Sequence, residues 1–186
     1  MSFGSFIAMA AIDKLVFRVS RAFITLPSID SWLLCALLLA ILALISLPIG
    51  FKFGFLQIDI FKASWQNILN IIAVSLLFPA ISEELFFRVL FLPHPTENAS
   101  TTTLLLWVFV SLVAFVVYHP LNAISFFPAG LKTFFNPIFL SLAALLGGAC
   151  TVAYLQSGSL WLSVVIHWLV VVVWLLLLGG YRKLHE

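Results

Sequence analysis

The chain has 186 residues, of which 63% are hydrophobic and only 9% are charged. Its mean hydropathy of +1.21 excludes an ordinary soluble domain, since such domains are roughly 45–50% apolar and about 25% charged. The formal net charge of +2 is too small to indicate a nucleic-acid partner. The composition instead predicts an integral, multi-pass membrane protein.

The first apolar stretch, residues 3–26, differs from the others because it carries several charges. Lys14, Arg18 and Arg21 stand at positions i, i+4 and i+7 and therefore share one helical face among apolar residues. This pattern predicts an amphipathic helix at the membrane interface, where its basic side chains could meet anionic headgroups. A sixth, poorly formed span is the alternative interpretation.

Five apolar runs follow that can cross, or nearly cross, the roughly 30 Å of bilayer hydrocarbon. They are residues 32–49, 67–92, 104–118, 137–155 and 160–178. Pro79 predicts a kink in the second run, and Pro120 is expected to end the third just after Tyr118. We therefore predict an all-α polytopic membrane helix bundle, with about five transmembrane helices plus the N-terminal interfacial helix. Residues 1–186 are expected to form a single membrane domain.

Smaller features predict how these helices connect and pack. The longest connection, residues 120–136, has the aromatic, glycine and proline content of an interfacial or re-entrant loop. Gly147-Gly148-Ala149 in the fourth run would permit close contact between helices. Cys35 and Cys150 both lie in apolar runs and are expected to be small core residues, because two cysteines alone give no disulfide framework or zinc site.

The second run carries three charges, Glu83, Glu84 and Arg88, with apolar sequence on both sides. Each charge near the bilayer centre costs roughly 2.5–3.5 kcal/mol, so three of them indicate a functional site facing other helices or a water cavity. Glu84 and Arg88 stand at i and i+4 and can pair. Glu83 is rotated by about 100° and keeps a carboxylate that can act as a general base. An ion pair that merely fixes helix packing is the alternative.

Histidines are the natural partners of these carboxylates. His119 follows the third run, four residues after Phe115 on the same helical face, and His167 lies within the fifth run. Ionisable groups in spans usually face the bundle interior, so both rings are expected to line one cavity with the two glutamates. His94 and His185 lie in a loop and near the C-terminus, and both are expected to be solvated.

Two chemical interpretations use these side chains. In the first, Glu83 and His119 activate a water that attacks a peptide carbonyl, and His167 donates a hydrogen bond to the oxyanion. In the second, glutamate and histidine ligate a metal ion that activates the water, although the His-Glu-x-x-His spacing of zincins is absent. Any metal or other cofactor therefore stays unknown. A serine protease is disfavoured, since no Gly-x-Ser-x-Gly elbow occurs.

The same residues resemble the motifs of a known family. Glu83 to Arg88, Glu-Glu-Leu-Phe-Phe-Arg, resembles the Glu-Glu-x-x-x-Arg motif of the CPBP family of CAAX-type proteases and bacteriocin-processing enzymes. The segment Phe115-Val-Val-Tyr-His119 is similar to its Phe-x-x-x-His motif, and His167 to the histidine of its His-x-x-x-Asn/Asp motif. The three occur in the family's order, within a family-like catalytic core of about residues 75–180.

The resemblance implies a glutamate-dependent intramembrane endopeptidase that cleaves a membrane-associated or prenylated-type peptide. It assigns water activation to Glu83 with His119, and oxyanion stabilisation to His167. The implied supporting residues are Glu84, Arg88 and Phe115. The expected partners are membrane lipid and a membrane-bound peptide or protein substrate, and no nucleic acid is expected.

One position departs from the family pattern. Val171 stands where the third motif has Asn or Asp, so a donor worth about 10²–10³ in rate is missing. The departure keeps a second class of function open, a non-proteolytic membrane scaffold or immunity protein of the same fold. A transporter is a weaker third interpretation, because no inverted repeat supports it.

Overall fold

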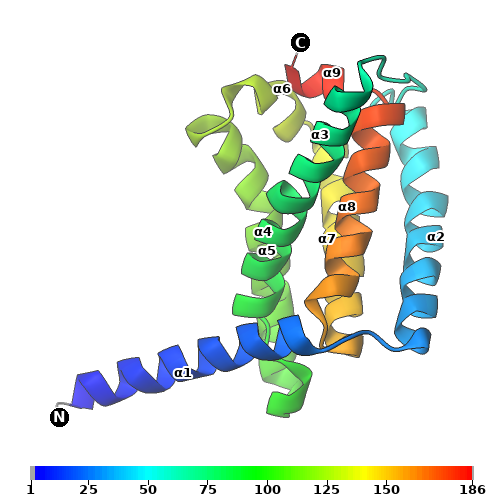
Figure 1. Ribbon diagram of the computed structural model, residues 1–186. Coiled ribbons are helices and arrows are strands. Elements are labelled where there is room, and N and C mark those ends of the chain that lie inside the picture. Colours follow the sequence, from blue (N-terminus) through cyan, green and yellow to red (C-terminus); the bar gives the residue numbers. More distant parts are fainter. Residues whose placement is uncertain (1–2, 186) are drawn as a thin grey trace.

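The computed structural model describes residues 3–185, a range that contains helices and their connections but no β-strand (Figure 1). Within this range, five helices are long and apolar enough to cross a membrane. In chain order they are α2 (Ile29–Lys52), a broken helix that begins with α3 (Trp65–Ser75), α5 (Thr101–Ser125), α7 (Pro137–Ser157) and α8 (Leu160–Leu177). The predicted all-α bundle with five spans is confirmed, and the chain is an integral, multi-pass membrane protein. Residues 1, 2 and 186 of the predicted single domain lie outside the described residues.

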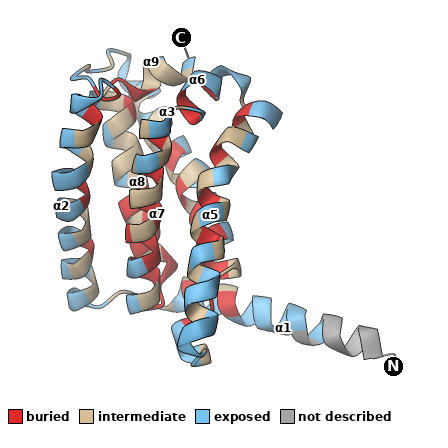
Figure 2. Cartoon of the chain, turned by 180° about the vertical axis from the view of Figure 1, so that it is seen from behind, coloured by how far each residue is buried: buried red, intermediate tan, exposed pale blue. Residues whose placement is uncertain are grey.

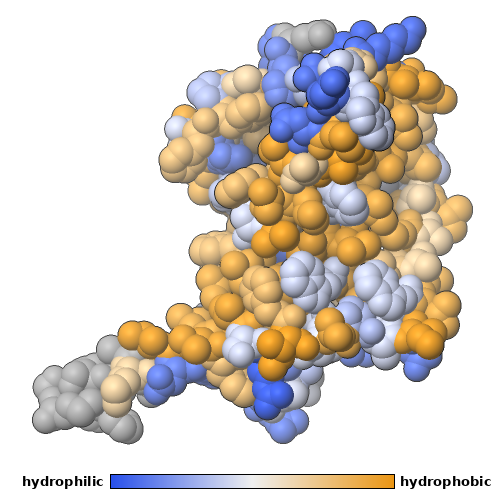
Figure 3. All heavy atoms as spheres, viewed as in Figure 1, coloured by the Kyte–Doolittle hydropathy of each residue, from blue (hydrophilic) through white to orange (hydrophobic). Residues whose placement is uncertain are grey.

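The outer surface of the bundle is the one expected in a bilayer. Large apolar side chains face outwards along the spans: Leu44, Phe109 and Leu105 are 76%, 66% and 62% exposed. Figure 2 shows the buried residues on the inward faces of the helices, and Figure 3 shows hydrophobic atoms along the sides with hydrophilic atoms at both ends. Apolar patches of this extent on a soluble protein would drive association, so lipid is their natural surrounding.

Polar caps and glycine set most helix ends. The side chains of Ser28, Ser100 and Ser159 accept hydrogen bonds from first-turn N–H groups of α2, α5 and α8. Asn136 caps α7, and Gly158 ends it at a φ of +66°, a left-handed conformation that favours glycine. Because these signals are local, the predicted bounds of four spans agree with the observed ones to within three residues.

The predicted end of the third span is wrong. Helix α5 does not stop after Tyr118 but continues through Pro120 to Ser125. Pro120 lacks an N–H group and so removes one helical hydrogen bond. Ending the helix there would expose several unpaired backbone groups in the hydrocarbon, which costs more than one missing bond.

Helix α1 (Phe3–Ile24) runs crosswise to the spans at the end of the bundle where α5 begins (Figure 1). The guanidinium of Arg18 donates to both carboxylate oxygens of Glu97, at 2.5 and 2.9 Å, and to the carbonyl of Leu90 at 3.1 Å. The ammonium of Lys14 lies 3.1 Å from Glu97. Two of the three cations expected to meet headgroups are therefore bound to an acid of the protein itself, and the third, Arg21, is exposed and stands 5.5 Å from the centre of the Phe17 ring. The interfacial position of α1 stays a prediction.

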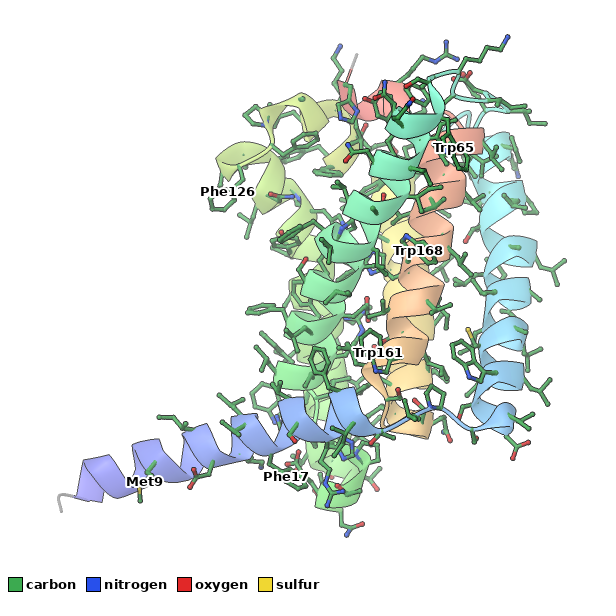
Figure 4. The ribbon with its side chains drawn as sticks, in the orientation of Figure 1. Met9, Phe17, Trp65, Phe126, Trp161 and Trp168 are labelled. Atoms are coloured by element: carbon green, nitrogen blue, oxygen red, sulfur yellow. The ribbon has the colours of Figure 1, made fainter. Side chains whose placement is uncertain are left out.

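Two tryptophans of α8 tie this helix to its neighbours (Figure 4). The indole N–H of Trp161 donates to the carbonyl of Phe23 in α1 at 3.0 Å. The indole N–H of Trp168 donates to the carbonyl of Ile72 in α3 at 2.9 Å. Each bond satisfies a polar ring nitrogen inside an apolar environment and fixes the position of α8 in the bundle.

Close contact between α7 and α5 depends on one glycine. A methyl group at Gly147 would lie 2.9 Å from side-chain atoms of Leu112 and Phe115 in α5. A methyl group at Gly148 would meet nothing within 4 Å. The predicted role of the small residues in helix contact is thus confirmed for Gly147 and is wrong for Gly148.

The connections between spans close the opposite end of the bundle from α1. The predicted loop over residues 120–136 contains two short helices, η4 (Pro128–Gly130) and α6 (Leu131–Phe134), and helix α9 (Gly180–His185) packs beside them. Backbone N–H groups of the α2–α3 connection donate to the last carbonyls of the fifth span, in the pairs Gln57–Leu178, Asp59–Leu177 and Phe61–Leu176. The carbonyl groups at the C-terminal end of the fifth span therefore receive hydrogen bonds from an extended segment elsewhere in the chain.

Candidate active site

The second span is broken just before its glutamates. Its parts after α3 are η1 (Leu76–Ile81), α4 (Ser82–Glu84) and η2 (Leu85–Leu90). Phe78 leaves the helical region, at φ −134° and ψ 111°, and a cis peptide bond joins it to Pro79. The kink predicted at Pro79 is confirmed. The segment η1 is a π-helix, in which the turns are wider than in an α-helix. Such segments are frequent at functional sites, and this one directly precedes the charged residues.

Glu84 is fully buried between two partners. One carboxylate oxygen lies 2.7 Å from Nδ1 of His167, and the other lies 3.2 Å from Nε of Arg88. The Arg88 guanidinium, also fully buried, stands 4.7 Å from the centre of the Phe115 ring. The predicted pair of Glu84 and Arg88 is present, and His167 joins it from the fifth span.

Glu83 lies on the other side of the same histidine. Its Oε2 atom is 3.9 Å from Nε2 of His167, the ring nitrogen that Glu84 does not contact. The Glu83 side chain is 10% exposed, against 0% for Glu84. Two neighbouring carboxylates therefore have different surroundings: one is enclosed by a cation and a ring, and the other borders open space.

His119 is oriented by its own helix. Its Nδ1 atom lies 2.8 Å from the carbonyl oxygen of Phe115. A carbonyl can only accept, so Nδ1 carries the hydrogen and Nε2 keeps a lone pair. The ring is enclosed by those of Phe115, Phe134 and Phe139, with centroids 5.0, 5.6 and 5.2 Å away. His119 therefore offers one hydrogen-bond acceptor in an apolar setting.

One cavity of about 960 Å³ joins these side chains, and Glu83, His119, His167 and Phe115 all line it. The prediction that Glu84 also lines this cavity is wrong, since Glu84 lies behind His167, to which it is bonded. The rest of the lining is mostly aliphatic and aromatic. A cavity of this size with a few convergent polar groups is typical of a small-molecule or peptide binding site.

The position that departs from the family pattern faces this cavity. Val171 lines it, one turn of α8 after His167. A polar side chain there would share the space of the candidate site. Its replacement by valine thus removes a donor from the cavity itself and not from a remote surface.

Cys150 of α7 is an additional member of the buried cluster. Its sulfur, a Glu84 oxygen and a His167 nitrogen all lie within 4.8 Å of one another. The prediction that Cys150 is a buried residue without a disulfide is confirmed, as it is for Cys35. Cysteine, histidine and glutamate are zinc ligands, but Arg88 already supplies a positive charge to Glu84.

The prediction that His94 is solvated is wrong. Its ring is 3% exposed, and Nε2 lies 3.1 Å from the carbonyl oxygen of Gly158 in the α7–α8 turn. Its Nδ1 atom lies 2.8 Å from the Thr96 hydroxyl, in a cap of the short helix η3 (Pro95–Glu97). The ring is buried because this connection packs against the next one. His185 is exposed as predicted, yet it also borders the cavity.

A family model described as type II CAAX prenyl endopeptidase Rce1-like matches residues 64–173. The match spans more than half of the chain and includes every residue of the candidate site. It agrees with the resemblance to the CPBP family that the motifs indicate. No curated protein and no solved structure matches the chain.

Proposed function

Since the chain belongs to the Rce1-like family of type II CAAX prenyl endopeptidases, we propose that it is a glutamate-dependent intramembrane endopeptidase. Its substrate is a membrane-associated or prenylated peptide, and its partners are this peptide and the surrounding lipid. The observation that carries the proposal is the shared cavity, to which three separate spans contribute Glu83, His119 and His167. An ion pair needed only for packing would explain Glu84 and Arg88 but not a second carboxylate beside open space.

In the proposed reaction a water molecule lies between Glu83 and the free Nε2 lone pair of His119. The Glu83 carboxylate accepts a proton from the water. The water oxygen then forms a bond to the carbonyl carbon of the peptide. The carbonyl electron pair moves to oxygen and gives a tetrahedral oxyanion. When the C–N bond breaks, the proton held by Glu83 passes to the leaving nitrogen, so Glu83 ends as a carboxylate.

His167 is the proposed donor to the oxyanion. Its Nδ1 atom faces a Glu84 oxygen at 2.7 Å, which requires a hydrogen on Nδ1, so Nε2 can donate only when the ring carries both protons. A doubly protonated His167 together with Arg88 balances the two glutamates, and the buried cluster then has no net charge. Glu84 and Arg88 act as positioning residues, because they hold this ring without touching the substrate.

Val171 leaves His167 without a neighbouring amide donor. Loss of one oxyanion donor typically lowers the rate by about 10²–10³, so slow hydrolysis is expected. The apolar remainder of the cavity suits a prenyl chain or hydrophobic side chains of the substrate.

The test is hydrolysis of membrane peptides, with and without a farnesyl group, by purified protein in detergent micelles. Glu83→Gln should lower the rate at least a hundredfold while the unfolding temperature stays close to that of the parent. Asp30→Asn, at an exposed position in the first turn of α2, is the matched control and should change neither. A chelator should leave the rate unchanged.

Full activity of Glu83→Gln would refute the proposed role of this carboxylate. Loss of activity with chelator would shift the chemistry to a metal held by the cluster of Glu84, Cys150 and His167. If the parent hydrolyses none of the peptides, the alternative function as a non-proteolytic membrane scaffold or immunity protein would be favoured.

A further inference from the structure

The hydroxyl of Tyr118 is a polar group of the cavity that the proposed reaction leaves unused. Tyr118 immediately precedes His119 on α5, at a position that the Phe-x-x-x-His motif leaves open. Its side chain is half-buried and lines the same cavity as Glu83 and His167. The centroids of the Phe87 and His119 rings lie 5.5 and 5.9 Å from that of Tyr118. These ring contacts hold the phenol at the wall of the candidate site.

This hydroxyl has no hydrogen-bond partner in the described part of the chain. The contacts of Tyr118 within residues 3–185 are the two ring contacts and an electrostatic interaction with the carboxylate of Glu83. A tyrosine hydroxyl surrounded by protein usually donates to a partner. The O–H group is therefore available to a molecule that enters the space beside Glu83.

Other polar side chains of the lining are less suitable as donors at this place. The hydroxyls of Ser75 and Ser82 already donate to the carbonyls of residues 71 and 79. The indole nitrogen of Trp174 is enclosed and not accessible from the cavity. Asn122 has a free amide, but it lies four residues beyond Tyr118, about 6 Å along the axis of α5 at about 1.5 Å per residue. No interaction connects this amide with Glu83.

The oxyanion of the proposed reaction forms in the space beside Glu83. Nε2 of His167, its proposed donor, lies 3.9 Å from the Glu83 carboxylate. Resting on the proposed function, we propose that the Tyr118 hydroxyl is a second hydrogen-bond donor to the oxyanion and offsets part of what Val171 cannot supply. Because the donors belong to α5 and α8, the oxyanion is held from two helices.

The charge shift during attack makes this donor catalytic. Negative charge leaves Glu83, which takes up the water proton, and appears on the carbonyl oxygen of the peptide. A phenol hydrogen rotates about its C–O bond and follows this charge. It therefore donates more strongly to the oxyanion than to the carbonyl of the bound peptide, which lowers the barrier. Tyr118 keeps its proton throughout.

Tyr118→Phe tests the proposal, because it keeps the ring and removes the donor. In the hydrolysis of a farnesylated peptide kcat should fall about a hundredfold, while KM changes less than about threefold. Tyr154→Phe is the matched control. The Tyr154 hydroxyl also lacks a partner among the described residues, but it is fully buried in α7 and does not line the cavity. This control should change neither constant.

Two further measurements separate a role at the oxyanion from a structural one. Val171→Asn should raise kcat by a larger factor in the Tyr118→Phe variant than in the parent, because both donors act on the same oxygen. A farnesylated peptide with a phosphinate in place of the scissile amide imitates the tetrahedral oxyanion. Its Kd, measured by titration calorimetry and so without turnover, should rise about a hundredfold in Tyr118→Phe and stay unchanged in Tyr154→Phe.

A Tyr118→Phe protein with parental kcat or parental affinity for the phosphinate would overturn the inference. Equal gains from Val171→Asn in the two backgrounds would overturn it as well. A loss of kcat in Asn122→Leu, with none in Tyr118→Phe, would assign the donor to the amide of α5. Each of these results leaves the proposed function intact as long as Glu83→Gln is inactive, whereas an active Glu83→Gln refutes the proposed function itself.

Discussion

Replacing Glu84 by glutamine tests the buried cluster directly. Glu84 and Arg88 are both 0% exposed, and His167 is 2% exposed. Glutamine keeps the shape of the side chain but cannot neutralise Arg88. All three guanidinium nitrogens of Arg88 lack a hydrogen-bond partner among the described residues, and Nε has only the ion pair with Glu84, so a cation would be left in a low-dielectric interior. Removing one member of a buried ion pair costs about 3–5 kcal/mol.

This loss is large enough to measure by thermal unfolding. For a chain of this length each kcal/mol shifts Tm by about 2–4 °C, so Glu84→Gln should lower Tm by about 6–20 °C. Unfolding of the purified variant is followed in detergent micelles by circular dichroism. Glu83→Gln is the matched control, because the nearest charged partner of Glu83 stands 3.9 Å away and its side chain borders open space. Its Tm should stay within a few degrees of the parent.

Equal losses in the two variants would refute the division of roles between the glutamates. A Glu84→Gln protein as stable as the parent would refute the buried ion pair itself. Stability retained with activity lost in both variants would mean that the cluster is catalytic throughout and that Arg88 is neutralised by another group.

Two further predictions concern the cavity and the helix contact beside it. Val171→Asn should raise the peptidase rate about tenfold or more, since it returns an amide to the cavity one turn after His167; an unchanged rate would show that this side chain does not reach the oxyanion. Gly147→Ala should destabilise the protein by about 1–3 kcal/mol, because the new methyl group would press on Phe115. Gly148→Ala should be tolerated, and equal melting temperatures for the two glycine variants would contradict the packing argument.

Local signals allowed the sequence to predict most of the fold. Length and hydropathy identify spans, and capping residues such as Ser100 and Asn136 act within one helical turn, so both can be read along the chain. The helix end predicted at Pro120 is wrong because the usual rule assumes that backbone groups beyond a proline can form hydrogen bonds with water. In a membrane the alternative is an unsatisfied backbone in hydrocarbon, so α5 continues.

The candidate site also has features that the sequence predicts and features that depend on tertiary packing. The pairing of Glu84 with Arg88 depends on a spacing of four residues and was predictable. The bond from His167 to Glu84 joins residues 83 positions apart and depends on how α8 packs against the broken span. The approach of Cys150 and the burial of His94 also depend on tertiary packing.

The crosswise attachment of α1 constrains how the protein can adapt to bilayer thickness. In its predicted interfacial position, α1 runs crosswise to the five spans and so extends along the membrane plane (Figure 1). The bonds of Arg18 to Glu97 and of Trp161 to the carbonyl of Phe23 fix α1 to the bundle. Tilting the bundle along the direction of α1 would lift one end of this helix or push it into the acyl chains. We therefore expect thickness mismatch to be met by deformation of the surrounding lipid more than by tilt, which would keep the carboxylate of Glu83 at a constant depth.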